Sequence, residues 1–196
     1  MGARSAARVG YSDRIHDPAF KRYVRHANYW ALLFAGILAV VAVVGFFIYG
    51  ETSSEMDNPQ ALYIGLGIGG MFLTIALITV LGRATSKTWD GVVVDKYVKR
   101  RRRRERSGDD TYEVPYDEYG VVIRDQRGKI HTLTADDDDT VYEYYQVGDQ
   151  VRHHKGLDTL EKYDKSRDSI IFCSACSTKH DITDDKCFRC GCPLLK

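Results

Sequence analysis

Two long apolar runs interrupt an otherwise polar chain. Residues 31–50 and 61–82 contain no Asp, Glu, Lys or Arg. In a helix, which rises about 1.5 Å per residue, about 20 apolar residues cross the roughly 30 Å hydrocarbon core of a bilayer. We therefore predict transmembrane helices over residues 29–50 and 61–82, joined by an extracytoplasmic loop over residues 51–60.

Basic residues lie on only one side of this predicted hairpin. Three Lys or Arg residues fall within residues 21–25 and two more within residues 83–87, whereas residues 51–60 contain three acidic residues and no Lys or Arg. Loops that stay in the cytoplasm carry the excess of Lys and Arg. The pattern predicts a cell-membrane protein that crosses twice, with both termini in the cytoplasm. No signal-peptide cleavage site is evident before residue 31.

Small residues recur along both apolar runs. Gly65 and Gly69 lie four residues apart in the second run, and Ala31, Ala35 and Ala39 form a similar stripe in the first. Small side chains let two membrane helices approach closely. We expect the two helices to pack together as a hairpin. The same stripes could instead serve self-association, so a homo-oligomer stays open.

The residues before the first span divide into two segments. Residues 1–12 are predicted to be disordered. Asp17 followed by Pro18 is typical of a helix start, and apolar residues then recur at helical spacing opposite basic ones. This pattern predicts a juxtamembrane amphipathic helix over residues 13–28. A straight extension of the first span is the alternative.

Residues 89–165 alternate short β-branched and aromatic runs with Gly and Asp, a pattern typical of strands and turns. The sequence Asp125 to Gly128 predicts a hairpin turn, and residues 142–146 a single helical turn. Five strands are too few for a sandwich, so we predict a small all-β, partly closed barrel of the SH3-like or OB-like kind. The predicted strands cover residues 89–98, 119–124, 129–134, 150–155 and 159–163.

A dense group of cations lies in the predicted connection between the first two strands. We interpret it as a contact with anionic lipids of the inner leaflet, where each cation near the surface gains about 1 kcal/mol. Nucleic acid is the alternative partner, although residues 83–196 contain 22 residues of each charge. A solvated loop without a ligand is the third possibility, and the acidic run 136–139 is expected to compensate the cations within the chain. The cations are Lys99, Arg100, Arg101, Arg102, Arg103, Arg104 and Arg106.

Two C-x-x-C pairs near the C-terminus are the strongest chemical signal. They are Cys173 with Cys176 and Cys187 with Cys190, separated by ten residues. A turn of this spacing directs both thiolates at one metal ion, and two such turns complete a tetrahedral shell. The sequence therefore predicts structural Zn²⁺ held by these four cysteines, and a cytosolic location disfavours disulfides.

Residues 172–195 resemble the zinc-ribbon family of domains. The resemblance includes an apolar pair before the first C-x-x-C, a polar turn and a glycine after the second, and it implies a zinc ribbon over residues 170–196. Ser177 departs from the glycine usual at that position, and Cys192 adds a fifth thiol that could replace Cys190. His180 could replace one thiolate, but we expect it to be a surface histidine. The whole chain resembles prokaryotic two-span membrane proteins of unknown function that end in such a ribbon.

No arrangement of catalytic residues can be assembled from the spacing, so we expect no enzymatic activity. His131, His153 and His154 are interpreted as ordinary strand residues. The favoured hypothesis is a non-catalytic, membrane-anchored binding or scaffold protein with a protein partner. One alternative is a membrane-tethered nucleic-acid-binding protein. The other is an accessory subunit of a membrane transport or secretion complex.

Overall fold

The computed structural model describes residues 9–53, 56–108 and 110–196. They form two compact units. The helical unit is Pro18–Ser86. The sheet unit combines the described residues up to Asp17 with Lys87–Lys196. Both ends of the chain therefore contribute to one unit, and the helical unit is an insertion between them.

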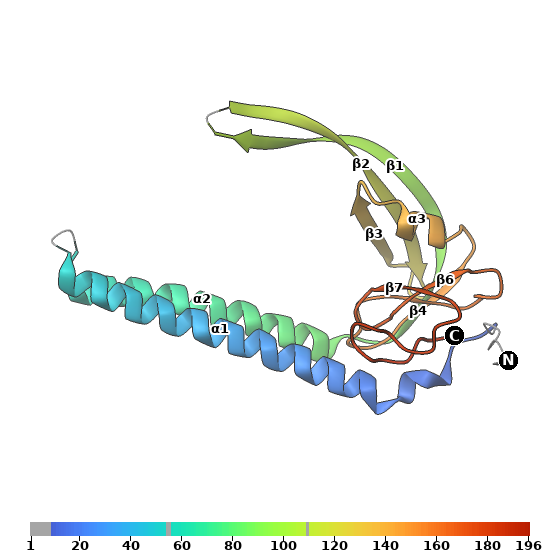
Figure 1. Cartoon of the computed structure of the whole chain (residues 1–196), viewed down its shortest axis with the longest axis horizontal. Helices are drawn as coiled ribbons and strands as arrows, with labels where there is room; N and C mark the ends of the chain where they lie inside the picture. Colours follow the sequence, from blue (N-terminus) through green and yellow to red (C-terminus); the bar gives the residue numbers. More distant parts are fainter. Residues whose placement is uncertain (1–8, 54–55, 109) are drawn as a thin grey trace. The chain divides into compact units, whose positions relative to one another are not determined.

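The helical unit consists of α1 (Pro18–Thr52) and α2 (Asn58–Thr85), each long and apolar enough to cross a membrane. Residues 18–28 form the first turns of α1, so they continue the first apolar helix rather than standing apart from it. At the start of α2, Asp57 has an extended backbone and a proline lies in the first turn, where its missing N–H costs nothing. The two helices lie side by side in Figure 1.

Small residues line the contact between α1 and α2. A Cβ atom added to Gly69 would lie 3.3 Å from the Cβ of Ala39, and one added to Gly65 would lie 3.1 Å from the Cα of Val43. The outer surfaces of the helices are apolar and exposed, as at Phe34 (63%) and Ile78 (64%). Exposed apolar surface on this scale is costly in water and is typical of a surface covered by lipid.

The sheet unit is built on five antiparallel strands in the order β3-β2-β1-β4-β5. Between β3 and β4 lies the short helix α3, and a second, two-stranded sheet pairs β6 with β7. A 3-10 turn, η1 (Asp13–His16), precedes α1. The elements are β1 (Trp89–Ser107), β2 (Asp110–Asp125), β3 (Ile130–Asp136), α3 (Thr140–Tyr144), β4 (Gln150–His153), β5 (Glu161–Lys162), β6 (Ile170–Phe172) and β7 (Lys179–Asp181).

The predicted hairpin of β2 and β3 is present, and the first connection differs from the prediction. Asp125 accepts hydrogen bonds from the backbone N–H groups of Arg127 and Lys129, and Gly128 has a φ of +82°, which glycine adopts without strain. The cation run was expected in a loop. Instead β1 continues through it to Ser107, and β1 and β2 extend beyond the other strands as a two-stranded ribbon (Figure 1).

The five-stranded sheet is open within the described part of the sheet unit. β3 and β5 lie at its two ends and share no ladder with each other. The prediction of five strands in an antiparallel sheet is confirmed, but the partly closed SH3-like or OB-like barrel is not. β5, at one end of the sheet, has only two residues.

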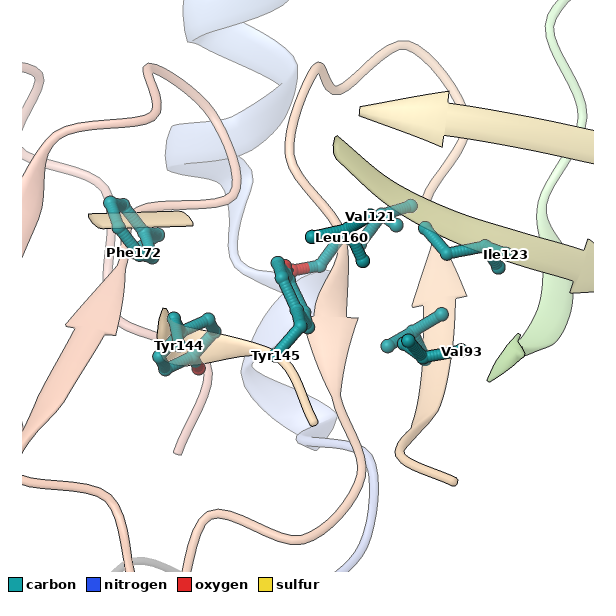
Figure 2. Close-up of a cluster of buried hydrophobic side chains, with 8 residues drawn as sticks. Val93, Val121, Ile123, Tyr144, Tyr145, Leu160 and Phe172 are labelled. Carbon is teal, nitrogen blue, oxygen red and sulfur yellow. The ribbon is translucent and has the colours of Figure 1, made fainter. Parts of the chain in front are cut away.

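The hydrophobic core joins the sheet to the C-terminal module. Val93, Val121 and Ile123 project from the sheet toward Tyr145, which follows α3. In Figure 2, Tyr145 lies between these side chains and the aromatic residues Tyr144 and Phe172. Because Phe172 directly precedes Cys173, the core fixes the entry to the first C-x-x-C turn.

Residues 9–12, predicted as part of a disordered terminus, pack on the sheet unit; residues 1–8 lie outside the described part. The backbone N–H of Gly10 donates to the carbonyl of Tyr163 at 2.9 Å, and Val9 forms an antiparallel bridge with Asp164. The tyrosine rings of Tyr11 and Tyr163 meet edge to face with centroids 5.1 Å apart. This N-terminal segment extends the sheet beyond β5.

Candidate metal centre

The C-terminal module presents its cysteines from two turns. The first turn follows β6, where the backbone N–H of Ser177 donates to the carbonyl of Cys173 at 2.9 Å. Ser177 has a φ of +58°, the left-handed conformation that a glycine adopts more easily. In the second turn Gly191, with a φ of +72°, donates to the carbonyl of Cys187 at 2.9 Å. Each turn brings its two thiols to one side.

The four predicted cysteines converge on one point. Their Sγ atoms all lie within 4.8 Å of one another, and the Cys173–Cys190 and Cys176–Cys187 pairs are each 3.5 Å apart. Four sulfurs placed about 2.3 Å from a central ion, at the corners of a tetrahedron, are about 3.8 Å apart. The cluster therefore fits a single metal ion with four thiolate ligands.

Hydrogen bonds favour the charged form of part of this cluster. Burial raises the pKa of the Cys176 thiol, but hydrogen bonds from the hydroxyl and backbone N–H of Thr178 and from the thiols of Cys187 and Cys190 together outweigh it and bring that pKa to about 7. The Thr178 Oγ1 atom lies 3.1 Å from the sulfur. Cys173 lies deeper, and burial raises its pKa to about 12. A thiol buried without a nearby cation ionises reluctantly, so a bound metal ion would supply the missing positive charge.

The structure separates Cys192 and His180 from the four-sulfur cluster. Cys192 is fully buried, and its carbonyl accepts a hydrogen bond from the N–H of Cys187 at 2.8 Å. It therefore packs inside the module and leaves the ligand position to Cys190. His180 was expected at the surface but is only 4% exposed. It lies on β7, and its ring contacts that of Phe188.

The predicted cation cluster forms what we call the arginine arm, residues 99–107 of β1 and 110–118 of β2. Directly opposite residues share a face of such a ribbon, and Arg100, Arg102, Arg104 and Arg106 follow one another at every second position of β1. They therefore share one face, about 6.8 Å apart along the strand. The remaining cations of the run occupy the other face.

Glutamates within the arm compensate part of this charge. Arg101 pairs with Glu118 at 2.8 Å, and Glu113 lies 3.4 Å from Arg102 and 3.8 Å from Arg104. All of these groups are exposed or half-buried, so each pair is worth at most about 1 kcal/mol. Arg100 has no side-chain partner among the described residues.

The acidic run 136–139 does not compensate the arm, contrary to expectation. Asp137 accepts a hydrogen bond from the N–H of Asp117 at 3.0 Å, and Asp138 accepts one from the N–H of Thr140 at 2.9 Å. Within the described residues these acids form no ion pair with the arginines. The acids instead close the loop between β3 and α3.

Sequence reasoning missed a buried charge cluster beneath the N-terminal segment. Glu161 accepts from Lys165 at 3.0 Å and contacts the Nε2 atom of His154 at 2.7 Å. The side chains of Glu161 and Lys165 are each 1% exposed. Lys165 also donates to the carbonyl of Gly10, and Glu161 accepts from the N–H of Ser12. His154 is therefore no ordinary strand residue, and the only hint in the sequence was the i, i+4 spacing of Glu161 and Lys165.

The other two strand histidines flank an indole. The ring of Trp89 stacks on His131 with centroids 4.1 Å apart and on His153 with centroids 5.4 Å apart. His131 lies 3.1 Å from a carboxylate oxygen of Asp125. These contacts account for both histidines as packing residues at the base of β1.

The chain matches no protein-family model, no curated protein and no solved structure. The resemblance to zinc-ribbon domains therefore stands on its motifs and on the four-cysteine geometry.

Proposed function

We propose that the protein is a non-catalytic binding or scaffold protein anchored in a cell membrane, with the sheet unit on the cytoplasmic face. One observation carries the proposal: the sheet unit contains the chain on both sides of the helical unit. Gly10 bonds to Tyr163 and Ser12 to Glu161, so the chain before α1 and the chain after α2 must lie on the same side of any membrane. Two crossings satisfy this condition.

The charge pattern supports a cytoplasmic location of the sheet unit. Lys21, Arg22 and Arg25 lie near the start of α1 and Arg83 near the end of α2, whereas the connection between the helices contains Glu51, Glu55 and Asp57. Positive charge is retained on the cytoplasmic side during insertion. A prokaryotic plasma membrane is the host that the resemblance of the whole chain implies.

Zinc is the ion that we assign to the four-cysteine cluster. Four thiolates in tetrahedral reach of one another are typical of structural zinc sites, and the cytoplasm keeps such thiols reduced. Cysteines fill all four ligand positions, which leaves none for a substrate. This argues for a structural role of the metal ion.

We assign the arginine arm to anionic headgroups of the inner leaflet. The face with Arg100, Arg102, Arg104 and Arg106 carries Glu113 and Asp117 as its opposite charges, so cations predominate on it. Each uncompensated cation near an anionic surface contributes about 1 kcal/mol.

Nucleic acid remains the second candidate for the arm because of its architecture. A two-stranded β-ribbon fits the major groove of B-form DNA, and clustered arginines neutralise phosphates. Tyr112 and Tyr116 lie on the face opposite the four arginines, and Arg103 already lies over the Tyr116 ring at 5.5 Å. The arm could thus offer rings for stacking and cations for phosphates.

Labelling with an impermeant maleimide on intact cells tests the topology. Asp57→Cys, between the helices, should react on intact cells. Arg167→Cys, on the surface of the sheet unit, should react only after permeabilisation, and the wild type with its five buried or half-buried cysteines controls for background. Labelling of Arg167→Cys on intact cells would overturn the proposal.

A second experiment separates the two candidates for the arm. The full-length protein in nanodiscs of phosphatidylcholine, with or without phosphatidylglycerol, is digested briefly with trypsin. Lipid contact predicts that phosphatidylglycerol protects the arm, and that Arg100→Gln with Arg102→Gln lowers this protection. Salt-dependent uptake of DNA or RNA by the same protein, with no protection by lipid, would favour the second candidate.

A further inference from the structure

A cavity of about 320 Å³ opens beside β3 in the sheet unit. Its walls include Tyr119, Tyr142, Tyr145 and Phe172, together with residues 132–135 of β3. This volume lies within the range of small binding pockets, and an aromatic lining with a few polar groups is typical of them. Phe172 and Ser177, which adjoin Cys173 and Cys176, also line the cavity, but none of the four cysteines and none of the arginines of the arm does.

The cavity lies along an open edge of the main sheet. The two end strands differ: β5 is extended by the N-terminal segment through Val9 and Gly10, whereas no described strand pairs with the outer side of β3. Exposed edge strands are usually protected by Lys, Pro or a bulge. β3, with the sequence Ile-His-Thr-Leu-Thr-Ala-Asp, contains none of these.

The hydrogen bonds at both ends of the β2–β3 ladder show which groups face outward. The N–H of Asp137 donates to the carbonyl of Asp117, and the N–H of Asp125 donates to the carbonyl of Lys129. In an antiparallel ladder such bonded pairs alternate with non-bonded ones, so the odd-numbered residues of β3 bond to β2. Thr132 and Thr134 therefore direct their N–H and C=O groups to the free edge, beside the cavity.

Carboxylates surround the mouth of the cavity. Asp158 lines it directly. The pKa of Tyr119, which also lines it, is raised by burial first and then by the nearby carboxylates of Asp117, Asp139 and Asp137. An occupant with positive charge would therefore be attracted to this end of β3.

The aromatic wall already accepts one cation. The Nζ atom of Lys96 lies 3.9 Å from the centre of the Tyr142 ring. A cation over a tyrosine ring gains about 0.5–1 kcal/mol at an exposed site and more where water is excluded. Aromatic faces combined with carboxylates are the chemistry that binds Lys and Arg side chains.

We propose that the free edge of β3 and the adjoining cavity bind an extended basic segment of a partner protein. The segment adds a strand to the sheet through Thr132 and Thr134, and it places a Lys or Arg side chain in the cavity lined by Tyr119 and Tyr142. Main-chain bonds give such complexes affinity, and the side-chain pocket gives them specificity. This inference deepens the proposed binding function by naming the partner's chemistry and the site.

Fluorescence anisotropy with the full-length protein in detergent tests the inference. The probe is a fluorescein-labelled hexapeptide of alternating valine and arginine, and the matched control probe replaces arginine with glutamate. We expect binding of the basic peptide that weakens as salt increases, and at least tenfold weaker binding of the acidic peptide. Equal binding of both peptides would overturn the proposal.

Two pairs of variants locate the site. Thr134→Pro removes an outward N–H without removing a bond to β2, so peptide binding should fall at least tenfold. The control variant Thr134→Ala keeps the N–H and should bind the peptide as the wild type does. Asp158→Asn combined with Asp139→Asn should weaken binding about fivefold, and Asp57→Asn in the helical unit should not. If Thr134→Pro fails to fold, as judged by its metal content and circular dichroism, the Asp variants decide the question.

Two further outcomes count against the inference. Wild-type affinity in both the Thr134→Pro and the Asp158→Asn/Asp139→Asn proteins would place the peptide elsewhere. Complete competition by millimolar tetramethylammonium would identify a small cation as the occupant rather than an extended segment. The binding assay uses detergent and no bilayer, so its result does not depend on the membrane topology. Absence of peptide binding would therefore not contradict the proposed topology, and an incorrect topology would not invalidate the peptide binding.

Discussion

The backbone N–H of Ser12 donates a 2.7 Å hydrogen bond to the carboxylate of Glu161, which lies 149 residues further along the chain. The two residues therefore lie on either side of the helical unit in the sequence. The same carboxylate bonds to His154 and Lys165. One buried acid on β5 therefore joins the N-terminal segment to the residue that follows β4.

Glu161→Gln should destabilise the sheet unit by about 3–5 kcal/mol, because the substitution leaves the buried Lys165 ammonium without a negative partner. Urea unfolding of the full-length protein in detergent, followed by the fluorescence of Trp89, measures this loss. Glu143→Gln, a matched change at an exposed position of α3, should alter stability by less than about 0.5 kcal/mol. Equal effects of the two changes would show that the buried cluster contributes no special stability.

The ion pair of Asp90 with Arg152 predicts a pH dependence. Two bonds of 2.6 and 2.7 Å join the side chains, and the hydrogen bond from Arg152 lowers the pKa of Asp90. A lowered folded-state pKa means that the stabilisation is fully present above the unfolded pKa of about 3.9 and is lost as the pH falls through the folded value.

Asp90→Asn should therefore cost about 1 kcal/mol between pH 5 and 8, a modest figure because both side chains are partly exposed. The difference from the wild type should shrink below about pH 4. Urea unfolding across this pH range provides the measurement, with Asp158→Asn as the exposed control. A difference that grew toward low pH would contradict the assigned sign.

The features that could be predicted from the sequence are those that depend on local patterns. An uninterrupted apolar run specifies a long apolar helix by its composition alone, and each C-x-x-C turn brings two thiols together within four residues. The hairpin turn from Asp125 to Gly128 is equally local. In each case neighbouring residues contain the whole signal, so no knowledge of distant contacts is needed.

The features that were missed depend on residues far apart in sequence. Five consecutive arginines lack the apolar alternation of a strand, and their strand conformation is set by cross-strand partners such as Glu118, 17 residues from Arg101. The docking of Gly10 and Ser12 depends on β5 and the residues that follow it. None of these pairings leaves a periodic trace in the sequence.

The close approach of α1 and α2 predicts unequal effects at neighbouring glycines. A Cβ atom at Gly69 would lie 3.2 Å from the Ala39 carbonyl oxygen, whereas one at Gly67 would meet nothing within 4 Å. Gly69→Val should therefore force the helices apart and cost about 1–3 kcal/mol. Gly67→Val makes the same chemical change on the open surface and should be nearly neutral. Unfolding by titration with sodium dodecyl sulfate, followed by circular dichroism, compares the two, and equal losses would argue against the packing at Gly69.

The metal cluster predicts that Cys176 and Cys192 respond differently to the same substitution. Cys176→Ser removes one of four ligands, and the purified protein should lose most of its zinc from about one ion per chain. Cys192 lies outside the four-sulfur group, so the Cys192→Ser protein should retain the ion. The buried hydroxyl should lower the stability of the fold by about 1–3 kcal/mol. Elemental analysis of both proteins measures the metal directly.

Removal of the metal by a chelator should also loosen the packing in the hydrophobic core of the sheet unit. Metal binding contributes about 10–16 kcal/mol to the folding of small zinc domains, so the stripped module should unfold. Phe172, next to Cys173, packs against Tyr144 with ring centroids 5.1 Å apart, and this contact should loosen. The near-ultraviolet circular dichroism of the tyrosines should weaken on chelation in the wild type and in Cys192→Ser, and should already be weak in Cys176→Ser. Zinc loss from Cys192→Ser equal to that from Cys176→Ser would contradict the assigned ligand set.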